Sequence, residues 1–484
     1  MDNSLNTYIK NQILIRPEKL NEDLEYNHKK FNKRTDYYQI IKYINDFIDG
    51  KNINRYIILP GIRDTGKTTL LFQIYDYLLK EKDIKPKNIL YISGDRLKKI
   101  GNYNIYEAIT AYINNYHNSI LETIKEPIFI LIDEAQYDSE WSLTGKIIFD
   151  ATKNIFMIFS GSSALQLSYN ADSARRLLNI PINPLNYSQH LKLKYSNFEN
   201  DISQSIINII FNGTIENSEK LENRILNIYT NFKNFEVNEW LDYLKFGGFP
   251  SSFYQNQNET SKKLIDMINR VVTIDMNNIE GISTETKNLA FQILYFFAFQ
   301  DPCETSKGSL ANQFDTNKKM ITKVLDILEK TKLIFHIETF TSSAKRTLKP
   351  NKYYFATPSL KHNLALDLGN ASLEDETAYL RKLFENYVAS SFYNLDNRSN
   401  ISYKTYYDIN NKKKKGKNVD FIMQRNQENP IPIEVSFGKK NKSQIKYAIS
   451  RYKSPYGIII SNNEENIKKE DDVIYLPTEI FALM

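Results

Sequence analysis

The sequence has a single cysteine and few histidines, which limits the chemistry that its side chains can support. Cys303 stands alone, so no disulfide can form within the chain and no cluster of thiolates can bind a metal ion. The histidines include His190, His336 and His362, which are scattered along the chain without the spacing of metal ligands. We therefore expect a protein of a reducing compartment, the cytoplasm.

Long apolar runs are absent as well. The first residues contain no apolar core of signal-peptide length, and Lys10 interrupts them. The apolar stretch Ile128–Ile132 ends at Asp133, far short of the roughly 20 residues that cross a membrane. The formal net charge is only +6, which permits binding to nucleic acid without requiring it. These features predict no membrane attachment.

The chain has 484 residues, more than one ordinary core holds, so we expect it to form several domains. Between Arg55 and Leu178, short apolar runs alternate with amphipathic stretches, which indicates a parallel sheet with helices on both faces. A mainly helical region follows. Next come a short helix, a turn at Asp315–Asn317, a helix over 318–330 and a strand, in the order of a winged helix-turn-helix. After Leu380, a helix, three strands, a helix and a final strand predict a second, smaller α/β unit.

A phosphate-binding loop is the most specific motif in the chain. Residues 61–68 fit G-x-x-x-x-G-K-[ST] and lie directly between a predicted strand and a predicted helix. Lys67 is expected to bind the β- and γ-phosphates of ATP, and the Thr68 hydroxyl is expected to hold Mg²⁺. The residues predicted to bind the nucleotide here are Gly61, Ile62, Arg63, Asp64, Thr65, Gly66, Lys67, Thr68 and Thr69.

Two later strands end in polar residues suited to the same site. The strand before Asp133 is buried, so Asp133 is predicted to hold magnesium through water and Glu134 to polarise the attacking water. Ser160 and Ser162 follow the next strand and are candidates to sense the γ-phosphate, although a simple turn explains them equally well.

Arg175 and Arg176 are candidates for a charge-stabilising arginine finger. A solvated helix end explains them equally well, and both explanations stay open.

The strings GIRDTGKTTLL, IDEAQ, FSGSSALQLS, ARRLLNIPINPLNYSQHL and FGGFP resemble the prokaryotic AAA-type ATPases related to the archaeal ATPase and STAND groups. The resemblance covers about residues 35 to 440. It implies a P-loop domain followed by a winged helix and a C-terminal nuclease-like domain. It also implies ATP binding with Mg²⁺, catalysis by Glu134, and arginine sensing near Arg175 or Arg176.

The C-terminal unit carries paired acids. Asp420 stands on one predicted strand and Glu434 on the next, and such a pair can hold Mg²⁺ and activate water against a phosphodiester. This arrangement resembles the PD-(D/E)xK nucleases, with Glu385 on the preceding helix as an extra acid. Ser436 stands where those nucleases have lysine, so an active site and an inactive nuclease-like fold both stay open. The candidates to replace that lysine are Lys439, Lys440, Gln444 and Lys446.

Two groups of lysines are candidates for phosphate contacts with nucleic acid. One is the run Lys412–Lys415, for which a solvated hairpin tip is the simpler explanation. The other lies on the second helix of the predicted winged helix, a module that also serves for packing. Its members are Lys318, Lys319, Lys323 and Lys330.

We therefore predict an α/β chain of five segments. They are an N-terminal helical segment (1–34), a P-loop ATPase domain (35–190), a helical lid region (191–284), a winged helix-turn-helix (285–360) and a nuclease-like domain (361–484). We expect a Mg²⁺-dependent ATPase whose nucleotide state controls a domain acting on nucleic acid, DNA rather than RNA, in defence or mobile-element maintenance. The alternative is an ATP-gated scaffold or STAND-type switch, in which an inactive nuclease-like domain binds DNA or a protein partner and the chain assembles with copies of itself.

Overall fold

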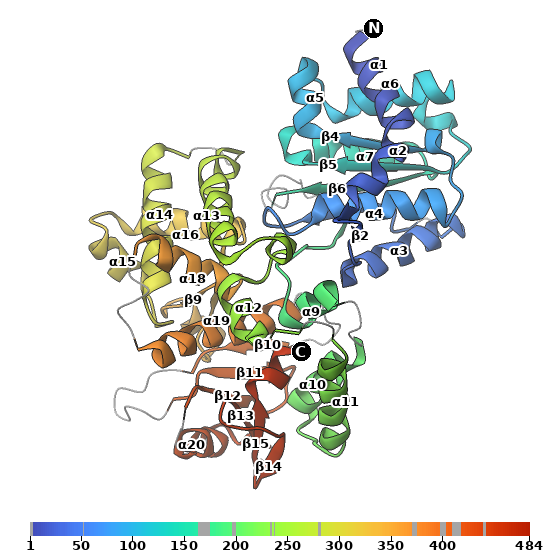
Figure 1. The fold of residues 1–484 in the computed structure, drawn as a ribbon. Helices are drawn as coiled ribbons and strands as arrows, with labels where there is room; N and C mark the ends of the chain where they lie inside the picture. The colour runs from blue at the N-terminus through green and yellow to red at the C-terminus, as the bar shows by residue number, and fades with distance from the viewer. Residues whose placement is uncertain are drawn as a thin grey trace. The chain divides into compact units, whose positions relative to one another are not determined.

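The computed structural model divides the chain into two compact units (Figure 1). The first comprises Met1–Asn183 with Thr273–Gly281, and the second comprises Pro184–Val272 with Ile282–Met484. The residues that the structure describes are 3–51, 53–162, 175–195, 200–232, 235–236, 238–278, 282–369, 375–396, 403–408, 418–438 and 442–484. The five-segment division stays a prediction.

The first unit is built on a parallel sheet. Its described strands are β3 (Tyr56–Pro60), β4 (Ile89–Ser93), β5 (Ile128–Asp133), β6 (Ile155–Gly161) and β7 (Leu178–Asn179). They lie in the order β4-β5-β6-β3-β7, and neighbouring strands run parallel. The apolar runs of β3 to β6 are buried throughout, as a sheet covered on both faces requires. The carboxyl ends of β3, β5 and β6 therefore meet at one edge, where ligands bind in such sheets.

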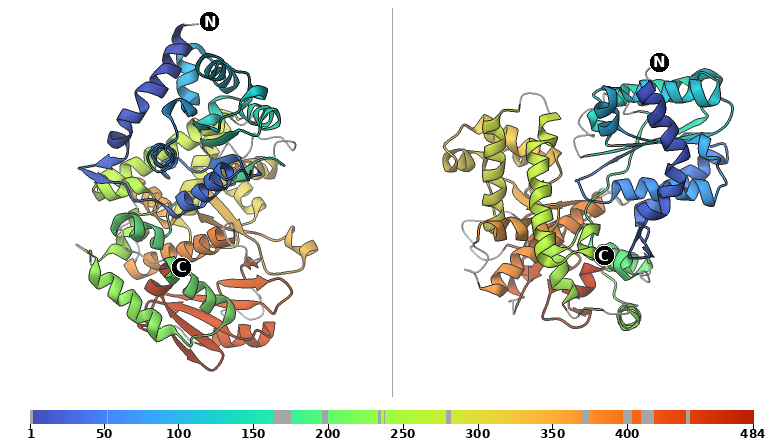
Figure 2. Two further views of the ribbon diagram at one scale, coloured as in Figure 1. Left: turned by 90° about the vertical axis from the view of Figure 1, so that its right-hand side faces the viewer. Right: turned by 45° about the horizontal axis from the view of Figure 1, so that its top comes forward.

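Helices cover both faces of this sheet. They are α1 (Asn3–Leu14), α2 (Arg16–Asp23), α3 (Thr35–Ile48), α4 (Lys67–Lys80), α5 (Gly94–Gly101), α6 (Ile105–His117) and α7 (Trp141–Ala151). Ile57 and Leu59 share a core with α2, α3 and α4, whereas Tyr56 and Ile58 share a core with α1, α6 and α7. The N-terminal helix, dark blue in Figures 1 and 2, thus belongs to the core of this unit. A short hairpin of β1 (Glu25–Tyr26) and β2 (Lys29–Lys30) connects α2 to α3.

The second unit begins with helices. They are α9 (Tyr187–Tyr195), α10 (Asn200–Asn212), α11 (Ser218–Asn231), α12 (Glu239–Phe246), α13 (Gln257–Thr273), α14 (Thr284–Phe299), α15 (Lys307–Gln313) and α16 (Lys318–Lys330). The side chains of Ser283, Ser306 and Asn317 cap the first turns of α14, α15 and α16. The antiparallel strands β8 (Ile334–Ile337) and β9 (Lys352–Phe355) follow, with α17 (Ser343–Arg346) between them. The helices and strand expected over this stretch are present, and their assignment as a winged helix stays a prediction.

The remainder of the second unit carries a mixed sheet. Its elements are α18 (Pro358–Asp367), α19 (Glu376–Asp396), β10 (Tyr403–Tyr406), β11 (Phe421–Arg425), β12 (Ile431–Ser436), α20 (Ser443–Tyr452), β13 (Gly457–Ser461), β14 (Lys468–Glu470), β15 (Val473–Pro477) and α21 (Thr478–Ala482). The strand order is β10-β11-β12-β13-β15-β14. The strands β10, β11 and β12 are antiparallel, and β12, β13 and β15 are parallel. The prediction that β13 is the final strand is wrong, because β15 pairs with it from further along the chain.

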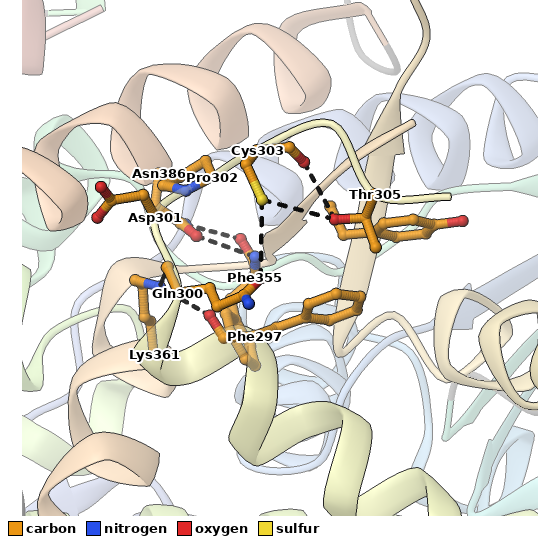
Figure 3. Close-up of a pocket in the computed structure, with 10 residues that line it drawn as sticks. Phe297, Gln300, Asp301, Pro302, Cys303, Thr305, Phe355, Lys361 and Asn386 are labelled. Carbon is orange, nitrogen blue, oxygen red and sulfur yellow. Dashed lines mark hydrogen bonds between the residues drawn. The ribbon is translucent and has the colours of Figure 1, made fainter. Parts of the chain in front are cut away.

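Two buried polar side chains connect elements of the second unit, one joining two helices and the other a helix and a strand (Figure 3). The Lys361 ammonium donates to the carbonyls of Phe297 (2.7 Å) and Gln300 (2.8 Å), so it satisfies the C-terminal end of α14. Asn386 of α19 exchanges hydrogen bonds of 2.9 and 2.8 Å with the backbone of Phe355. Among the described helices, none is long and apolar enough to span a bilayer.

Candidate functional site

The phosphate-binding loop connects β3 to α4 and needs its glycines for two different reasons. A Cβ atom on Gly61 would lie 2.2 Å from the carbonyl oxygen of Ile182, so only glycine fits there. Gly66 has φ of 89°, in the left-handed region that a residue with a Cβ rarely adopts. Asp64 also has a positive φ, of 63°. The loop ends where Lys67, Thr68 and Thr69 form the first turn of α4.

Lys67 points back into this loop. Its ammonium donates to the carbonyl oxygens of Gly61 (2.9 Å) and Ile62 (2.8 Å), and its side chain is buried. Burial lowers the pKa of the Lys67 ammonium, and the nearby carboxylates of Glu134 and Asp133 oppose that shift. The positive charge of Lys67, which is expected to bind phosphate, therefore lies within the loop.

Asp133 is held by hydroxyl groups from neighbouring elements. Thr68 Oγ1 donates to Asp133 Oδ2 at 2.7 Å, and Tyr91 of β4 donates to the same oxygen at 3.2 Å. The Ser160 hydroxyl at the end of β6 donates to Oδ1. The structure thus brings together three residues that the sequence predicted separately, Thr68, Asp133 and Ser160. Tyr91 was missed, because it reads as an ordinary apolar strand residue.

Glu134 follows β5 in a left-handed conformation, with φ of 51°. Its side chain accepts a hydrogen bond from the Gln136 amide, and Gln136 in turn accepts one from the backbone N–H of Ser162 at 3.1 Å. Burial, and then the charge of Asp133, raise the pKa of the Glu134 carboxyl. A Cβ on Gly94 would lie 2.6 Å from the Glu134 carbonyl oxygen, so a larger residue at position 94 would displace the backbone of Glu134.

Two ion pairs reach the loop from distant parts of the first unit. Arg34 pairs with Asp36 at 2.7 Å and donates to the carbonyl of Thr65. Arg63 pairs with Asp275, which lies 212 residues further along the chain. Arg34 and Asp275 were not predicted as site residues, and no local motif marks either residue.

The arginines proposed as fingers lie just before β7. Arg175 is exposed, and Arg176 donates to Asp150 of α7 at 2.7 Å. Arg176 therefore has an acidic partner on α7, and the roles of both arginines stay predictions.

The C-terminal acids lie at the start of β11 and on β12. Phe421 of β11 pairs with Ile433 of β12. Asp420, the residue before Phe421, accepts a hydrogen bond of 2.8 Å from the backbone N–H of Val435. Glu434, beside Val435, is buried.

Glu385 of α19 lies within electrostatic range of Asp420. Its Oε1 accepts a hydrogen bond from Tyr354 at 3.0 Å and lies 3.7 Å from the Lys352 ammonium. Burial raises the pKa of the Glu385 carboxyl, the charge of Lys352 opposes this shift and that of Asp420 adds to it. Lys352 and Tyr354 were not predicted as site residues, because both belong to β9, outside the predicted nuclease-like segment.

The other candidates near the acids are placed as follows. Lys446 pairs with Asp471 at 3.0 Å, and the Ser436 hydroxyl donates to the Gly438 carbonyl at 2.9 Å. The predicted Lys412–Lys415, Lys439 and Lys440 lie outside the described residues. Across the described residues, no group of three or more His, Cys, Asp or Glu side chains is arranged to hold a metal ion. Metal binding by the C-terminal acids therefore stays a prediction.

Comparison with protein families divides the chain into matched regions. Residues 53–191 match an AAA domain. Residues 237–377 match a domain of unknown function (DUF8612), and residues 381–481 match another (DUF4143).

Similar proteins occur in an archaeon and in a bacterium. The chain is 32% identical over 480 residues to the protein MJ1637 of Methanocaldococcus jannaschii, covering 99% of this chain and 94% of that protein. It is 23% identical over 325 residues to a Haemophilus influenzae protein, covering 65% of this chain and 70% of that protein. Among solved structures, AMPPCP-bound DnaA from Aquifex aeolicus is 15% identical, covering 61% of this chain and 87% of that chain. Its TM-score of 0.25 is too low to support any further comparison.

Proposed function

We propose a function from the premise that this chain belongs to the same family as the Methanocaldococcus jannaschii protein MJ1637 and contains an AAA-type P-loop ATPase domain. The proposed function is to bind ATP together with Mg²⁺ and to hydrolyse the bond between the β- and γ-phosphates of ATP. The observation that carries the proposal is the convergence of Thr68, Ser160 and Asp133 beside the loop that holds Lys67.

Phosphate binding follows from the geometry of the loop. Backbone N–H groups at the start of α4 and the positive end of its helix dipole favour an anion there. Lys67 adds a positive charge inside the loop. The oxygens of Thr68 and Asp133 are the kind of ligand that Mg²⁺ prefers, so these residues fit the ion. When bound, Mg²⁺ neutralises charge on the phosphate oxygens.

Hydrolysis needs a group that orients water and accepts its proton. Glu134 is the residue suited to this role, because its raised pKa makes its carboxylate a better proton acceptor. Gln136 holds the carboxylate and connects it to the end of β6 through the backbone of Ser162. Gln136 thus serves as a positioning residue for Glu134.

The test compares Lys67→Ala and Glu134→Gln with the wild-type chain. We expect Lys67→Ala to lose ATP binding, and Glu134→Gln to bind ATP while its hydrolysis rate falls about 10²–10⁴-fold. Lys51→Ala is the matched control, because Lys51 is exposed and pairs only locally with Asp46. Wild-type hydrolysis rates in Glu134→Gln would refute the role of Glu134.

The C-terminal unit is proposed to act on nucleic acid, DNA rather than RNA. The supporting observations are that Asp420 accepts a hydrogen bond from the backbone beside Glu434 and that its charge acts on Glu385. The Lys352 ammonium lies 3.7 Å from Glu385 Oε1. Lys352 is thus a candidate for the positive charge that Ser436 does not supply. A defence or mobile-element role is proposed on the family resemblance alone.

Cleavage assays test this second part. Plasmid, single-stranded DNA and RNA are incubated with the chain and Mg²⁺ or Mn²⁺, with and without ATP. We expect cleavage that Glu434→Gln abolishes and that Glu428→Gln, a change in an exposed pair with Arg425, leaves intact. Nucleic acid that stays uncut under all these conditions would refute the nuclease proposal.

The alternative is an ATP-gated scaffold or switch whose C-terminal unit binds DNA or a protein without cleaving. It is favoured by Ser436 at the lysine position and by the lack of a metal-binding group among the described residues. This alternative predicts a change in molecular mass with ATP, as copies of the chain assemble, together with uncut nucleic acid. A mass that does not change with ATP would contradict the assembly.

A further inference from the structure

The P-loop arginine forms a two-pronged ion pair. Arg63 Nη2 donates to Asp275 Oδ1 at 2.6 Å, and Arg63 Nε donates to Oδ2 at 3.0 Å and to Oδ1 at 3.2 Å. The Asp275 side chain is only 4% exposed and that of Arg63 only 19%. Paired, charge-assisted hydrogen bonds of this kind are the strong class, and water screens them little at such burial.

Asp275 lies in a short segment of the first unit that interrupts the second unit in the sequence. It lies in the 3₁₀ turn Asp275–Asn278, within the segment Thr273–Gly281 that belongs to the first unit. The residues on either side, through Val272 and from Ile282, belong to the second unit. The ion pair therefore holds to the P-loop a short segment that continues into the second unit at both ends.

The charge of Asp275 also acts on the phosphate-binding groups. Burial by itself would lower the pKa of Arg63, but the hydrogen bond and charge of Asp275 raise it, and the charge of Glu134 adds to this. Asp275 likewise favours the charged form of Lys67. A carboxylate that engages Arg63 and lies within electrostatic range of Lys67 opposes any further anion in the loop.

We propose that Asp275 is an autoinhibitory competitor of nucleotide phosphate: ATP draws Arg63 from Asp275 and so releases the turn Asp275–Asn278 from the P-loop. The inference rests on the ATP binding proposed above and adds its regulation. Carboxylate and phosphate compete for the same guanidinium because both accept paired hydrogen bonds from it. By linkage, whatever holds the segment in place weakens ATP binding, and ATP loosens the segment by the same factor.

The first experiment measures ATP affinity by titration calorimetry with Mg²⁺. We expect Asp275→Asn to bind ATP about tenfold more tightly than the wild type, within the usual range of coupling between sites. The same change made in an Arg63→Gln background is expected to have a smaller effect, because the ion-pair partner is gone and only the charge of Asp275 near Lys67 is removed. Asp46→Asn, which removes a carboxylate paired with Lys51, is the control and should leave the affinity unchanged.

A second measurement uses the wild-type chain alone, so it does not depend on the folding of a variant. Hydrogen exchange in the peptide that contains Asp275 should rise when ATP is added. An Asp275→Asn affinity equal to or weaker than that of the wild type, or exchange that ATP leaves unchanged, would overturn this inference while ATP binding stands. A wild-type chain that binds no ATP would overturn the proposed function and this inference together.

Discussion

Replacing Ser160 by alanine tests whether neighbouring hydroxyl groups hold Asp133 in place. Ser160 is fully buried at the end of β6, and its hydroxyl donates to Asp133 Oδ1. Thr68 and Tyr91 donate to the other oxygen, so the change leaves Oδ1 with the backbone N–H of Glu134 at 3.1 Å as its described donor. Because Asp133 is only 4% exposed, water does not easily replace the lost hydroxyl.

The magnitude follows from this burial. A hydrogen bond to a charged group contributes about 1.5–3 kcal/mol. In a unit of this size, each kcal/mol changes the Tm by about 2–4 °C. We therefore expect Ser160→Ala to lower the Tm of the first unit by roughly 3–12 °C. ATP hydrolysis should fall as well, because Asp133 becomes less well oriented toward Thr68.

Thermal unfolding followed by calorimetry, with ATP hydrolysis measured on the same samples, gives both quantities. Ser119→Ala is the control, since that hydroxyl is exposed and bonds only to Thr123 and to the carbonyl of Ile120. A Ser160→Ala chain that unfolds within about 1 °C of the control would show that the hydroxyl does not hold Asp133.

Three other changes probe the same fold. Gly94→Ala places a Cβ 2.6 Å from the Glu134 carbonyl oxygen, so hydrolysis should fall while ATP binding persists; equal hydrolysis would refute this close contact. Arg34→Ala removes the donor to the Thr65 carbonyl and should weaken ATP binding, which a fluorescent nucleotide would report; unchanged affinity would contradict it. Burial lowers the pKa of His362 to about 4 from 6.5, so unfolded chains bind more protons between these values. The unfolding free energy should therefore fall by about 3 kcal/mol as the pH drops from 6.5 to 4, and His362→Gln should remove that slope in denaturant titrations.

Local patterns predicted the strand, loop and helix of the P-loop segment, because their geometry is local. The glycines of the loop and the start of α4 lie within eight consecutive residues, and their conformations depend on their own side chains. Asp133 ends an apolar strand, and the carboxyl ends of adjacent parallel strands must share one edge. The contact between Ser160 and Asp133 follows from that rule, although the sequence left Ser160 open to a simpler explanation.

Prediction was poorer where pairing depends on distant segments. The apolar run of β15 was not predicted as a strand. It pairs in parallel with β13, and a parallel pair is not joined by a short turn that the sequence could reveal. The N-terminal residues also carried little signal, yet Leu5 and Ile9 are buried in the core of the first unit. The sequence of an amphipathic helix predicts that its apolar face is buried, but it does not predict which face of which sheet that helix packs against.

The sequence by itself determined the phosphate-binding loop, the acids at the end of β5 and the alternation that produces a parallel sheet. Only the tertiary structure decided which distant residues meet these groups: Tyr91 at Asp133, Asp275 at Arg63 and Lys352 at Glu385. The physical reason is the range of the interactions. Backbone conformation and periodicity are set by neighbouring residues, whereas an ion pair across 212 residues exists only because packing brings its two segments together.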